Sequence, residues 1–133
     1  VSADGIYLVI KDGRIVKTLG LPNNLFTRLD PNLNWDEKSR LGKESISYLS
    51  FKNPTLHNLK VSSTFIVNEY QDIDLTFGKK NLRLIEEYIE SETIAWNASN
   101  DYWLDVDDFI WKSTQHISPK LPPIHYEVTK RPL

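Results

Sequence analysis

The chain has 133 residues, of which 40% are hydrophobic and 26% charged, and its formal net charge is -2 at pH 7. This length is typical of one globular domain with a buried core, and the small net charge excludes the basic surface expected of a nucleic-acid-binding protein. Cysteine is absent, so disulfides, a thiolate nucleophile and cysteine-ligated zinc are also excluded.

The start of the sequence indicates a piece of a longer precursor. The chain begins at Val1, contains no methionine and runs almost at once into a predicted strand. No charged-then-apolar signal segment opens it, and its longest apolar run, residues 6–10, is far shorter than the roughly 20 residues that span a bilayer. We therefore expect a soluble fragment, with any targeting signal upstream.

Residues 6–19, IYLVIKDGRIVKTL, have the pattern of a β-hairpin. Asp12-Gly13 is a favoured central pair of a two-residue type I′ turn, because both positions need positive φ. The predicted cross-strand pairs are Ile10 with Ile15 and Val9 with Val16. Both faces of the hairpin then contain apolar side chains, so we expect it to lie within a larger sheet or barrel.

Residues 19–44 are rich in Pro, Asn, Asp and Gly and show no sustained period. They predict a long connection with one short helical turn around 34–40. Connections of this length in compact domains are often functional or mobile.

From residue 45 onward, short strand-like segments alternate with turn residues. The predicted strands are 45–51, 59–70, 73–77, 82–90, 102–106, 109–117 and 124–130. The predicted turns are Asn53-Pro54, Gly78, Asn97–Asn100, Asp107-Asp108 and 118–123. This spacing predicts an all-β fold, an antiparallel sandwich or a barrel-like meander with the long loop at about 19–44 and at most one or two short helical turns.

Residues 81–92 fit two patterns. Leu82, Ile85 and Ile89 match a helical stripe, and the glutamates of this segment favour helix. The same residues also fit the alternation of a strand, so the choice between helix and strand stays open at this point.

Residues 100–115 predict a second hairpin, centred on Asp107-Asp108. One face would pair Val106 with Phe109, Leu104 with Trp111 and Tyr102 with Ser113, as a core face. The other would pair Asp105 with Ile110, Trp103 with Lys112 and Asp101 with Thr114. Trp103 then has two interpretations: a contact with Lys112 on a half-wet face, or a platform for a sugar ring or partner protein beside Asp101 and Asp105.

Catalytic and metal motifs are missing from the sequence. The carboxylates of residues 105–108 lack the glycine and distal glutamate of a helix-loop calcium site. His116 and His125 could meet, yet the sequence offers no third zinc ligand. A glycosidase-like pair could be drawn from Glu86, Glu87, Glu90 and Glu92, although a solvated acidic face explains them more simply. We expect no catalytic residue, no metal and no cofactor.

The closing segment, NDYWLDVDDFIWKSTQHISPKLPPIHYEVTKRP, resembles the closing signature of the YjbF-like (GfcB-like) lipoproteins, which are bacterial outer-membrane proteins encoded with capsule and exopolysaccharide genes. The matching residues are Asn100, Tyr102-Trp103, Asp105, Ile110, Ser113, Gln115, Pro119 and Pro122. The segment DGIYLVIKDGRIVKTLGLPNNL is similar to the hairpin of that family and its following Asn-Leu pair. Asp108 replaces the family's turn glycine, which is compatible because Asp tolerates positive φ.

The resemblance implies an antiparallel β-barrel-like fold, which favours strand over helix at 81–92. It also implies a non-enzymatic role in polysaccharide export, with the precursor anchored to the outer membrane by a lipid on a cysteine that these residues do not include, facing the periplasm. The expected partners are polysaccharide or other outer-membrane export proteins. We expect residues 1–133 to form a single β domain of a longer lipoprotein.

Aromatic and acidic residues give the candidate binding surface. These candidates are Trp35, Trp96, Asp101, Trp103 and Asp105. The alternative function is a periplasmic carrier that holds a lipid or other apolar ligand inside the barrel. That alternative requires a large interior void lined by residues such as Val9, Phe65 and Trp111.

Overall fold

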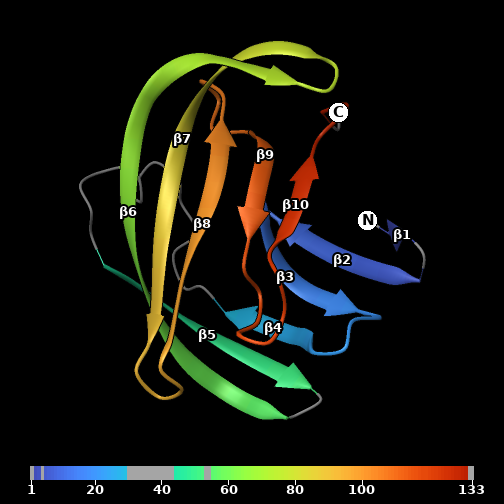
Figure 1. Ribbon diagram of the computed structural model, residues 1–133, viewed down its shortest axis with the longest axis vertical. Coiled ribbons are helices and arrows are strands. Elements are labelled where there is room, and N and C mark those ends of the chain that lie inside the picture. Colours follow the sequence, from blue (N-terminus) through green and yellow to red (C-terminus); the bar gives the residue numbers. More distant parts are fainter. Residues whose placement is uncertain (1, 4, 30–43, 53–54, 132–133) are drawn as a thin grey trace.

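The computed structural model describes residues 2–3, 5–29, 44–52 and 55–131, and within these ranges the chain forms antiparallel strands and turns with no helix (Figure 1). The strands are β1 (Ser2–Ala3), β2 (Ile6–Lys11), β3 (Arg14–Leu19), β4 (Asn24–Leu29), β5 (Ser45–Lys52), β6 (Leu56–Leu75), β7 (Gly78–Ser91), β8 (Trp96–Leu104), β9 (Ile110–Gln115) and β10 (Ile124–Glu127). The predicted all-β fold is therefore confirmed.

These strands form two sheets. The smaller has the order β1-β2-β3, and the larger has the order β10-β9-β8-β7-β6-β5-β4. Figure 1 shows that the larger sheet is strongly curved, so that it forms a half-barrel. The turn of the β2–β3 hairpin contacts the concave side of this sheet, because the Gly13 carbonyl accepts hydrogen bonds from Gln115 on β9 and Tyr126 on β10.

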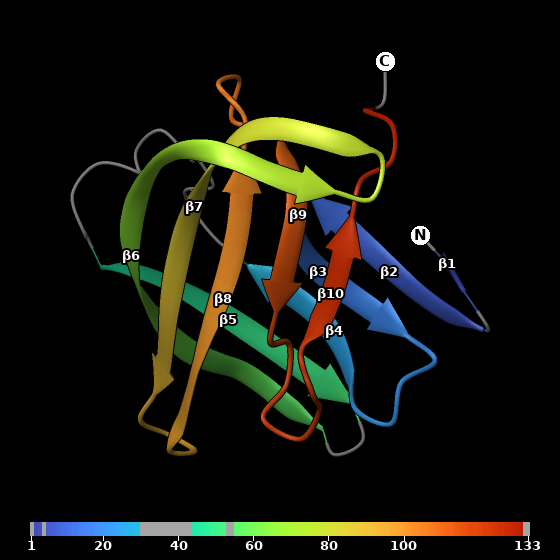
Figure 2. The same cartoon turned by 45° about the horizontal axis from the view of Figure 1, so that its top comes forward.

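β6 and β7 form one long hairpin. The predicted strands 59–70 and 73–77 are a single strand, with a register shift between Val67 and Tyr70. Figure 2 shows the tip of this hairpin extending across the end of β9 toward β10. There the Thr76 amide donates to Glu127 Oε1 at 3.2 Å, and Lys80 Nζ lies 4.0 Å from the ring centroid of Trp111.

The first predicted hairpin is correct at its turn and wrong beyond it. Asp12 and Gly13 have φ values of 50° and 80°, and Ile10 pairs with Ile15, as predicted. Val9 pairs with Lys17 instead of Val16, because the register shifts between Val9 and Ile10.

Part of the predicted connection 19–44 is a strand. Residues 24–29 form β4 and pair with β5, with Leu25 buried opposite Phe51. This strand was not predicted because the segment is rich in polar residues. In addition, the register shift between Leu25 and Thr27 interrupts the alternation of buried and exposed residues along it. The helical turn predicted at 34–40 lies outside the described residues.

Two further predictions concern β7 and β8. Residues 78–91 are a strand, so the strand pattern and not the helical stripe is correct for this segment. The turn predicted at Asn97–Asn100 is wrong, because these residues lie within β8. The connection instead spans residues 92–95, where Ala95 has φ of 50° and Ser91 pairs with Trp96.

The second predicted hairpin is correct in three pairs. Asp101, Tyr102 and Trp103 face Thr114, Ser113 and Lys112. Leu104 pairs with Ile110 rather than Trp111 because a bulge follows Trp103. Leu104 and Trp111 are nevertheless buried, as predicted.

The turn of this hairpin is longer than predicted. The Asp108 amide donates to the Asp105 carbonyl at 3.0 Å, which closes a four-residue turn. Asp108 itself has a left-handed backbone conformation, with φ of 61°. Val106, which was predicted on the core face, is 74% exposed. It is displaced because the extra loop residue moves it out of the strand.

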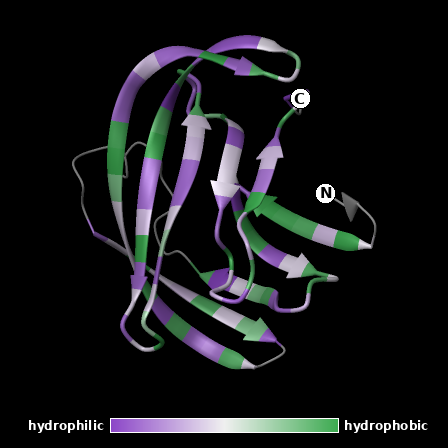
Figure 3. Ribbon diagram, in the orientation of Figure 1, coloured by the Kyte–Doolittle hydropathy of each residue, from purple (hydrophilic) through white to green (hydrophobic). Residues whose placement is uncertain are grey.

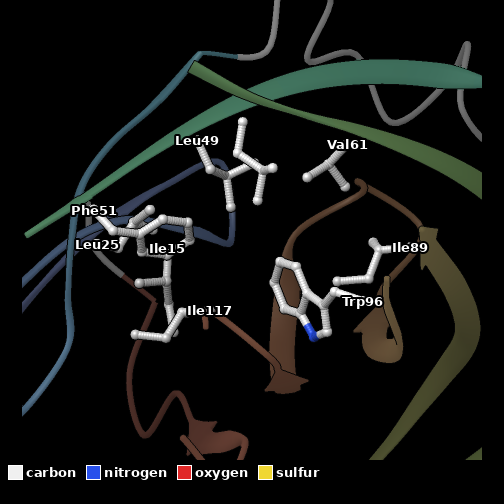
Figure 4. Close-up of a cluster of buried hydrophobic side chains, with 9 residues drawn as sticks. Ile15, Leu25, Leu49, Phe51, Val61, Ile89, Trp96 and Ile117 are labelled. Carbon is white, nitrogen blue, oxygen red and sulfur yellow. The ribbon is translucent and has the colours of Figure 1, made fainter. Parts of the chain in front are cut away.

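The interior of the half-barrel has three layers. One end holds an apolar cluster of Ile15, Leu25, Leu49, Phe51, Leu59, Val61, Ile89, Trp96 and Ile117, most of which Figure 4 shows. The other end holds a second cluster of Phe65, Ile85, Tyr102, Leu104 and Ile110. Along β6, β7, β8 and β9, the buried residues between these clusters are polar, namely Ser63, Glu87, Asn100, Ser113 and Gln115.

Alternation along the strands separates this interior from the convex outer face. Figure 3 shows hydrophobic and hydrophilic bands following one another along β6 and β7. On β7, Ile85, Glu87 and Ile89 are buried, while Tyr88 between them is exposed. The side chains available to a ligand on the larger sheet are therefore those of its convex face.

Candidate functional site

The polar layer is centred on the carboxylate of Glu87, which is fully buried. Arg14 Nη2 lies 2.5 Å and Arg28 Nη2 lies 3.5 Å from Glu87 Oε2. On the other oxygen, Oε1, Tyr102 donates its hydroxyl at 2.7 Å and Asn100 donates its amide at 3.0 Å. The carboxylate thus joins β3 and β4 to β7 and β8.

Burial alone would raise the pKa of Glu87. The Arg14 guanidinium and the hydrogen bonds from Tyr102 and Asn100 outweigh that effect, and the pKa of Glu87 is lowered. Burial and the neighbouring carboxylate raise the pKa of Tyr102 well above its ordinary value. The layer therefore holds an ionised glutamate with protonated donors around it.

Gln115 connects the same layer to the β2–β3 hairpin. Its Oε1 accepts a hydrogen bond from the Ile15 amide at 2.9 Å, and its Nε2 donates to the Gly13 carbonyl at 2.7 Å. Nε2 also donates to Ser113 Oγ at 2.9 Å. Residues of the closing signature therefore fix the small sheet against the large one, and no solvent-facing atom of Glu87 or Asn100 is left for a ligand.

This polar layer was not predicted from the sequence. One signal for Glu87 was available, because it shares the parity of Ile85 and Ile89 in an alternating segment, which places it on the buried face. Nothing local distinguishes Arg14 or Arg28, since their burial depends on strands far along the chain.

The same parity separates three of the four glutamates considered for a glycosidase-like pair. Glu87 points into the interior, whereas Glu86 and Glu90 belong to the outward-facing positions of β7. Carboxylates on opposite faces of one strand cannot flank one scissile bond. Glu86 and Glu90 share a face but are four residues apart, about 13 Å, which exceeds the separation in either mechanism.

On the convex face, the predicted candidates Trp103 and Asp101 lie two residues apart on β8. Strand register sets Trp103 between Leu84 and Lys112, and Asp101 between Glu86 and Thr114. Both candidate side chains are partly exposed. In the part of the chain that the structure describes, no cation–π contact joins Trp103 to Lys112, so the indole plane is not occupied by that side chain.

Asp101 has an unusual electrostatic setting for a surface carboxyl. Its partial burial raises its pKa, and the Glu86 carboxylate beside it raises the pKa further. Next to it, Thr114 Oγ1 and His125 Nδ1 lie 2.7 Å apart. A tryptophan beside hydrogen-bonding oxygens on an open sheet face is an arrangement that can hold a sugar ring.

Asp105 is not available to this surface. One carboxylate oxygen accepts hydrogen bonds from the Asp107 and Phe109 amides at 2.8 and 3.1 Å, and the other accepts from Trp111 Nε1 at 2.8 Å. Burial raises the pKa of Asp105, but the hydrogen bonds from Trp111 and the two amides lower it overall. Asp105 therefore holds the β8–β9 turn together.

Asp105→Ala is expected to lower the free energy of unfolding by about 1–3 kcal/mol, because it removes the acceptor of three hydrogen bonds. Urea denaturation followed by tryptophan fluorescence measures the change. Asp107→Ala is the control, since Asp107 is exposed and its carboxylate forms an ion pair with Arg131 at 3.6 Å. Equal unfolding midpoints for the two variants would contradict the role given to Asp105.

The two remaining candidates, Trp96 and Trp35, are not found on this surface within the described residues. Trp96, predicted as a surface residue, is only 7% exposed and packs in the first apolar cluster, because β8 begins at this residue and its side chain faces inward (Figure 4). Trp35 lies outside the described residues. Of the predicted surface candidates, the structure thus brings Trp103 and Asp101 together on an open face.

The described residues contain no group of three or more His, Asp or Glu side chains placed to hold a metal ion. His125 contacts Thr114, and the His116 amide donates to Asn100 Oδ1 at 2.7 Å. Since none of the described segments is helical, none of them offers a helix that could cross a membrane.

Comparison with known proteins adds a family and a fold. Residues 1–128 match the model of the YjbF family, described as group 4 capsule polysaccharide lipoprotein gfcB, YjbF. The crystal structure of the hypothetical lipoprotein YmcC from Escherichia coli K12 superposes with a TM-score of 0.80 at 20% identity, over 95% of this chain and 68% of that one. No curated protein matches the sequence. At this identity the structural likeness establishes the fold alone.

Proposed function

The chain belongs to the YjbF family of group 4 capsule polysaccharide lipoproteins, and we propose that it supports capsule or exopolysaccharide assembly or export by binding the polysaccharide, without catalysing a reaction. The binding surface is the convex face of the larger sheet around Trp103 and Asp101. The precursor is held at the outer membrane by a lipid anchor and faces the periplasm. Another export component is the second class of ligand for the same face.

The observation that supports this proposal is the contrast between the two faces of the larger sheet. Its concave side is filled by buried side chains, including Arg14, Phe65 and Tyr102. Its convex side presents an indole, a carboxyl of raised pKa and a hydroxyl in adjacent register positions. Aromatic planes beside fixed polar groups give both affinity and orientation for a sugar ring.

The interior does not favour the alternative of a carrier for an apolar ligand. Val9, one of the residues predicted to line an internal void, is 49% exposed on the outside of β2. Phe65 and Trp111 are packed at 2% and 9% exposure. The space between the two sheets is crossed by the hydrogen bonds of Gln115 to the β2–β3 hairpin and by the Arg14–Glu87 ion pair.

Trp103→Ala is expected to weaken binding of the polysaccharide purified from the producing bacterium about tenfold, since loss of a stacking contact of this kind amounts to about 1.4 kcal/mol. Isothermal titration calorimetry measures the change, and circular dichroism checks that the variant is folded. Trp103→Phe keeps an aromatic plane and is expected to retain most of the affinity. A folded Trp103→Ala protein that binds like the wild type would remove Trp103 from the site.

A further inference from the structure

A groove of about 500 Å³ lies on the same convex face, over β6, β7 and β8. Its lining includes Glu44, Thr64, Tyr88, Glu90, Asn97 and Ser99. Tyr88 is at its centre, because strand register pairs it with Thr64 on one side and Ser99 on the other. Among these lining residues, only Glu90 was predicted from the sequence as a candidate for a functional role.

Tyr88 presents a plane for stacking. Its side chain is 44% exposed although it lies in the middle of a seven-stranded sheet, between strands that pair on both sides. Small side chains at Thr64 and Ser99 leave the ring uncovered across both neighbouring strands. An exposed ring flanked by small polar groups is the arrangement in which an aromatic residue can meet the apolar face of a ligand ring.

Within the described part of the chain, the small polar groups that flank this ring have no hydrogen-bond partner. Thr64, Asn97 and Ser99 are exposed, and their side chains make no hydrogen bond to any residue that the structure describes. Each offers a donor and an acceptor. Hydroxyl-rich ligands match such a set, because every hydroxyl can both donate and accept.

The charge of the lining residues limits the kind of ligand that the groove can bind. Glu44 and Glu90 line the groove, and no Lys, Arg or His is among the lining residues that the structure describes. A uronic acid, sulfate or phosphate would meet like charge there, at a cost that no cation among these described residues offsets. The groove therefore fits uncharged sugar units.

The groove lies on the same strand and the same face as Trp103. Ser99, the register partner of Tyr88, and Trp103 both belong to β8 and share the outward parity, four residues apart, about 13 Å along the strand. Asp101 lies between them on the same face. One extended oligosaccharide along β8 can contact both aromatic rings.

We propose that the Tyr88 groove is a subsite for an uncharged sugar unit of the polysaccharide, and that a single glycan segment runs from this groove past Asp101 to Trp103. This inference rests on the proposed function and adds the position, direction and charge class of the bound glycan.

The test uses short oligosaccharide fragments of the purified polysaccharide. Tyr88→Ala is expected to weaken their binding about tenfold, and Tyr88→Phe is expected to keep most of it, since the ring remains. Tyr7→Ala is the matched control and should bind like the wild type, because Tyr7 is similarly exposed, at 54%, on the smaller sheet. In the wild-type protein, the amide resonances of Asn97 and Ser99 are expected to shift during the same titration.

Salt dependence tests the charge class. Affinity for an uncharged segment is expected to be the same at low and high sodium chloride, whereas a steep loss at high salt would indicate ionic recognition and overturn that part of the proposal. The groove is not a subsite if Tyr88→Ala binds like the wild type and the amide resonances of Asn97 and Ser99 do not shift. If Trp103→Ala still weakens binding in that case, the proposed function stands. If the wild type binds no fragment and no intact polymer, the proposed function itself is wrong.

Discussion

Replacing Glu87 with glutamine is expected to lower the free energy of unfolding by about 3–5 kcal/mol, the range for breaking a buried ion pair from one side. The substitution keeps the size of the side chain but removes the charge that faces Arg14 and Arg28 in the polar layer. Urea denaturation of the two proteins at neutral pH gives the difference.

Glu86→Gln is the matched control. Glu86 is the adjacent residue of the same strand and points to the convex face, where a carboxylate is solvated and has Asp101 as a like-charged neighbour. We expect this change to alter stability by less than about 0.5 kcal/mol. If Glu87→Gln and Glu86→Gln unfold at the same urea concentration, the polar layer does not hold the two sheets together.

The pH dependence of stability gives a second measure of Glu87. Its pKa is lowered on folding from the ordinary value of 4.5, so the unfolded chain binds this proton more readily than the folded one. The stabilisation is therefore fully present above about pH 4.5 and is lost as the pH falls through the lower pKa of the folded state. Glu87→Gln should remove this acid-side loss, so its curve of stability against pH should be flatter below that value.

Gly13→Ala is the second large expected effect. A Cβ atom at Gly13 would lie 2.0 Å from the Cδ1 and 2.8 Å from the Cβ of Ile110, and the φ of Gly13 is +80°. Because the Cβ of Ile110 cannot move away by a rotamer change, we expect a loss of about 2–5 kcal/mol from overpacking and left-handed backbone together.

Gly5→Ala separates the two causes. Gly5 has nearly the same φ, +79°, and nothing within 4 Å of the Cβ position, so that variant shows the backbone cost alone, about 1–2 kcal/mol. In an Ile110→Gly background, which removes both the Cδ1 and the Cβ contacts, Gly13→Ala should cost little more than Gly5→Ala does. An undiminished cost in that background would show that the hairpin turn does not contact Ile110 as described.

Local signals were sufficient for much of the fold. The Asp12-Gly13 turn was predictable because two adjacent residues set their own backbone angles. The strand at 82–90 could be read only as an alternative, since its glutamates favour helix while its pairing with β6 and β8 decides for strand. Bulges after Val9 and Trp103 were beyond reach, because they depend on how two strands fit together.

The candidate site, too, was predictable where local sequence decides and not where strand pairing decides. Trp103 could be selected because its hairpin register was right for three pairs, and Trp96 was misjudged because the start of β8 was misplaced by a predicted turn. The Tyr88 groove needed the register of three strands, from β6 to β8, which no single segment of sequence specifies. The local sequence pattern was thus sufficient to predict the hairpins. The convex surface depends on the pairing of strands that the local pattern does not specify.

The closing signature of the family has a structural meaning in this chain. Asn100, Tyr102, Ser113 and Gln115 all face the interior and take part in the polar layer or its contact with the β2–β3 hairpin. Trp103 shares that signature but faces outward. The inward-facing residues of the signature therefore hold the fold closed.

The central claim is that the convex face, and not the interior, binds the glycan. The direct measurement is a nuclear magnetic resonance titration of the tryptophan indole N–H signals with oligosaccharide fragments of the purified polysaccharide. We predict that the Trp103 signal shifts with saturation, while those of the buried Trp96 and Trp111 stay unchanged. Saturable shifts of Trp96 or Trp111 with an unmoved Trp103 signal would contradict the claim.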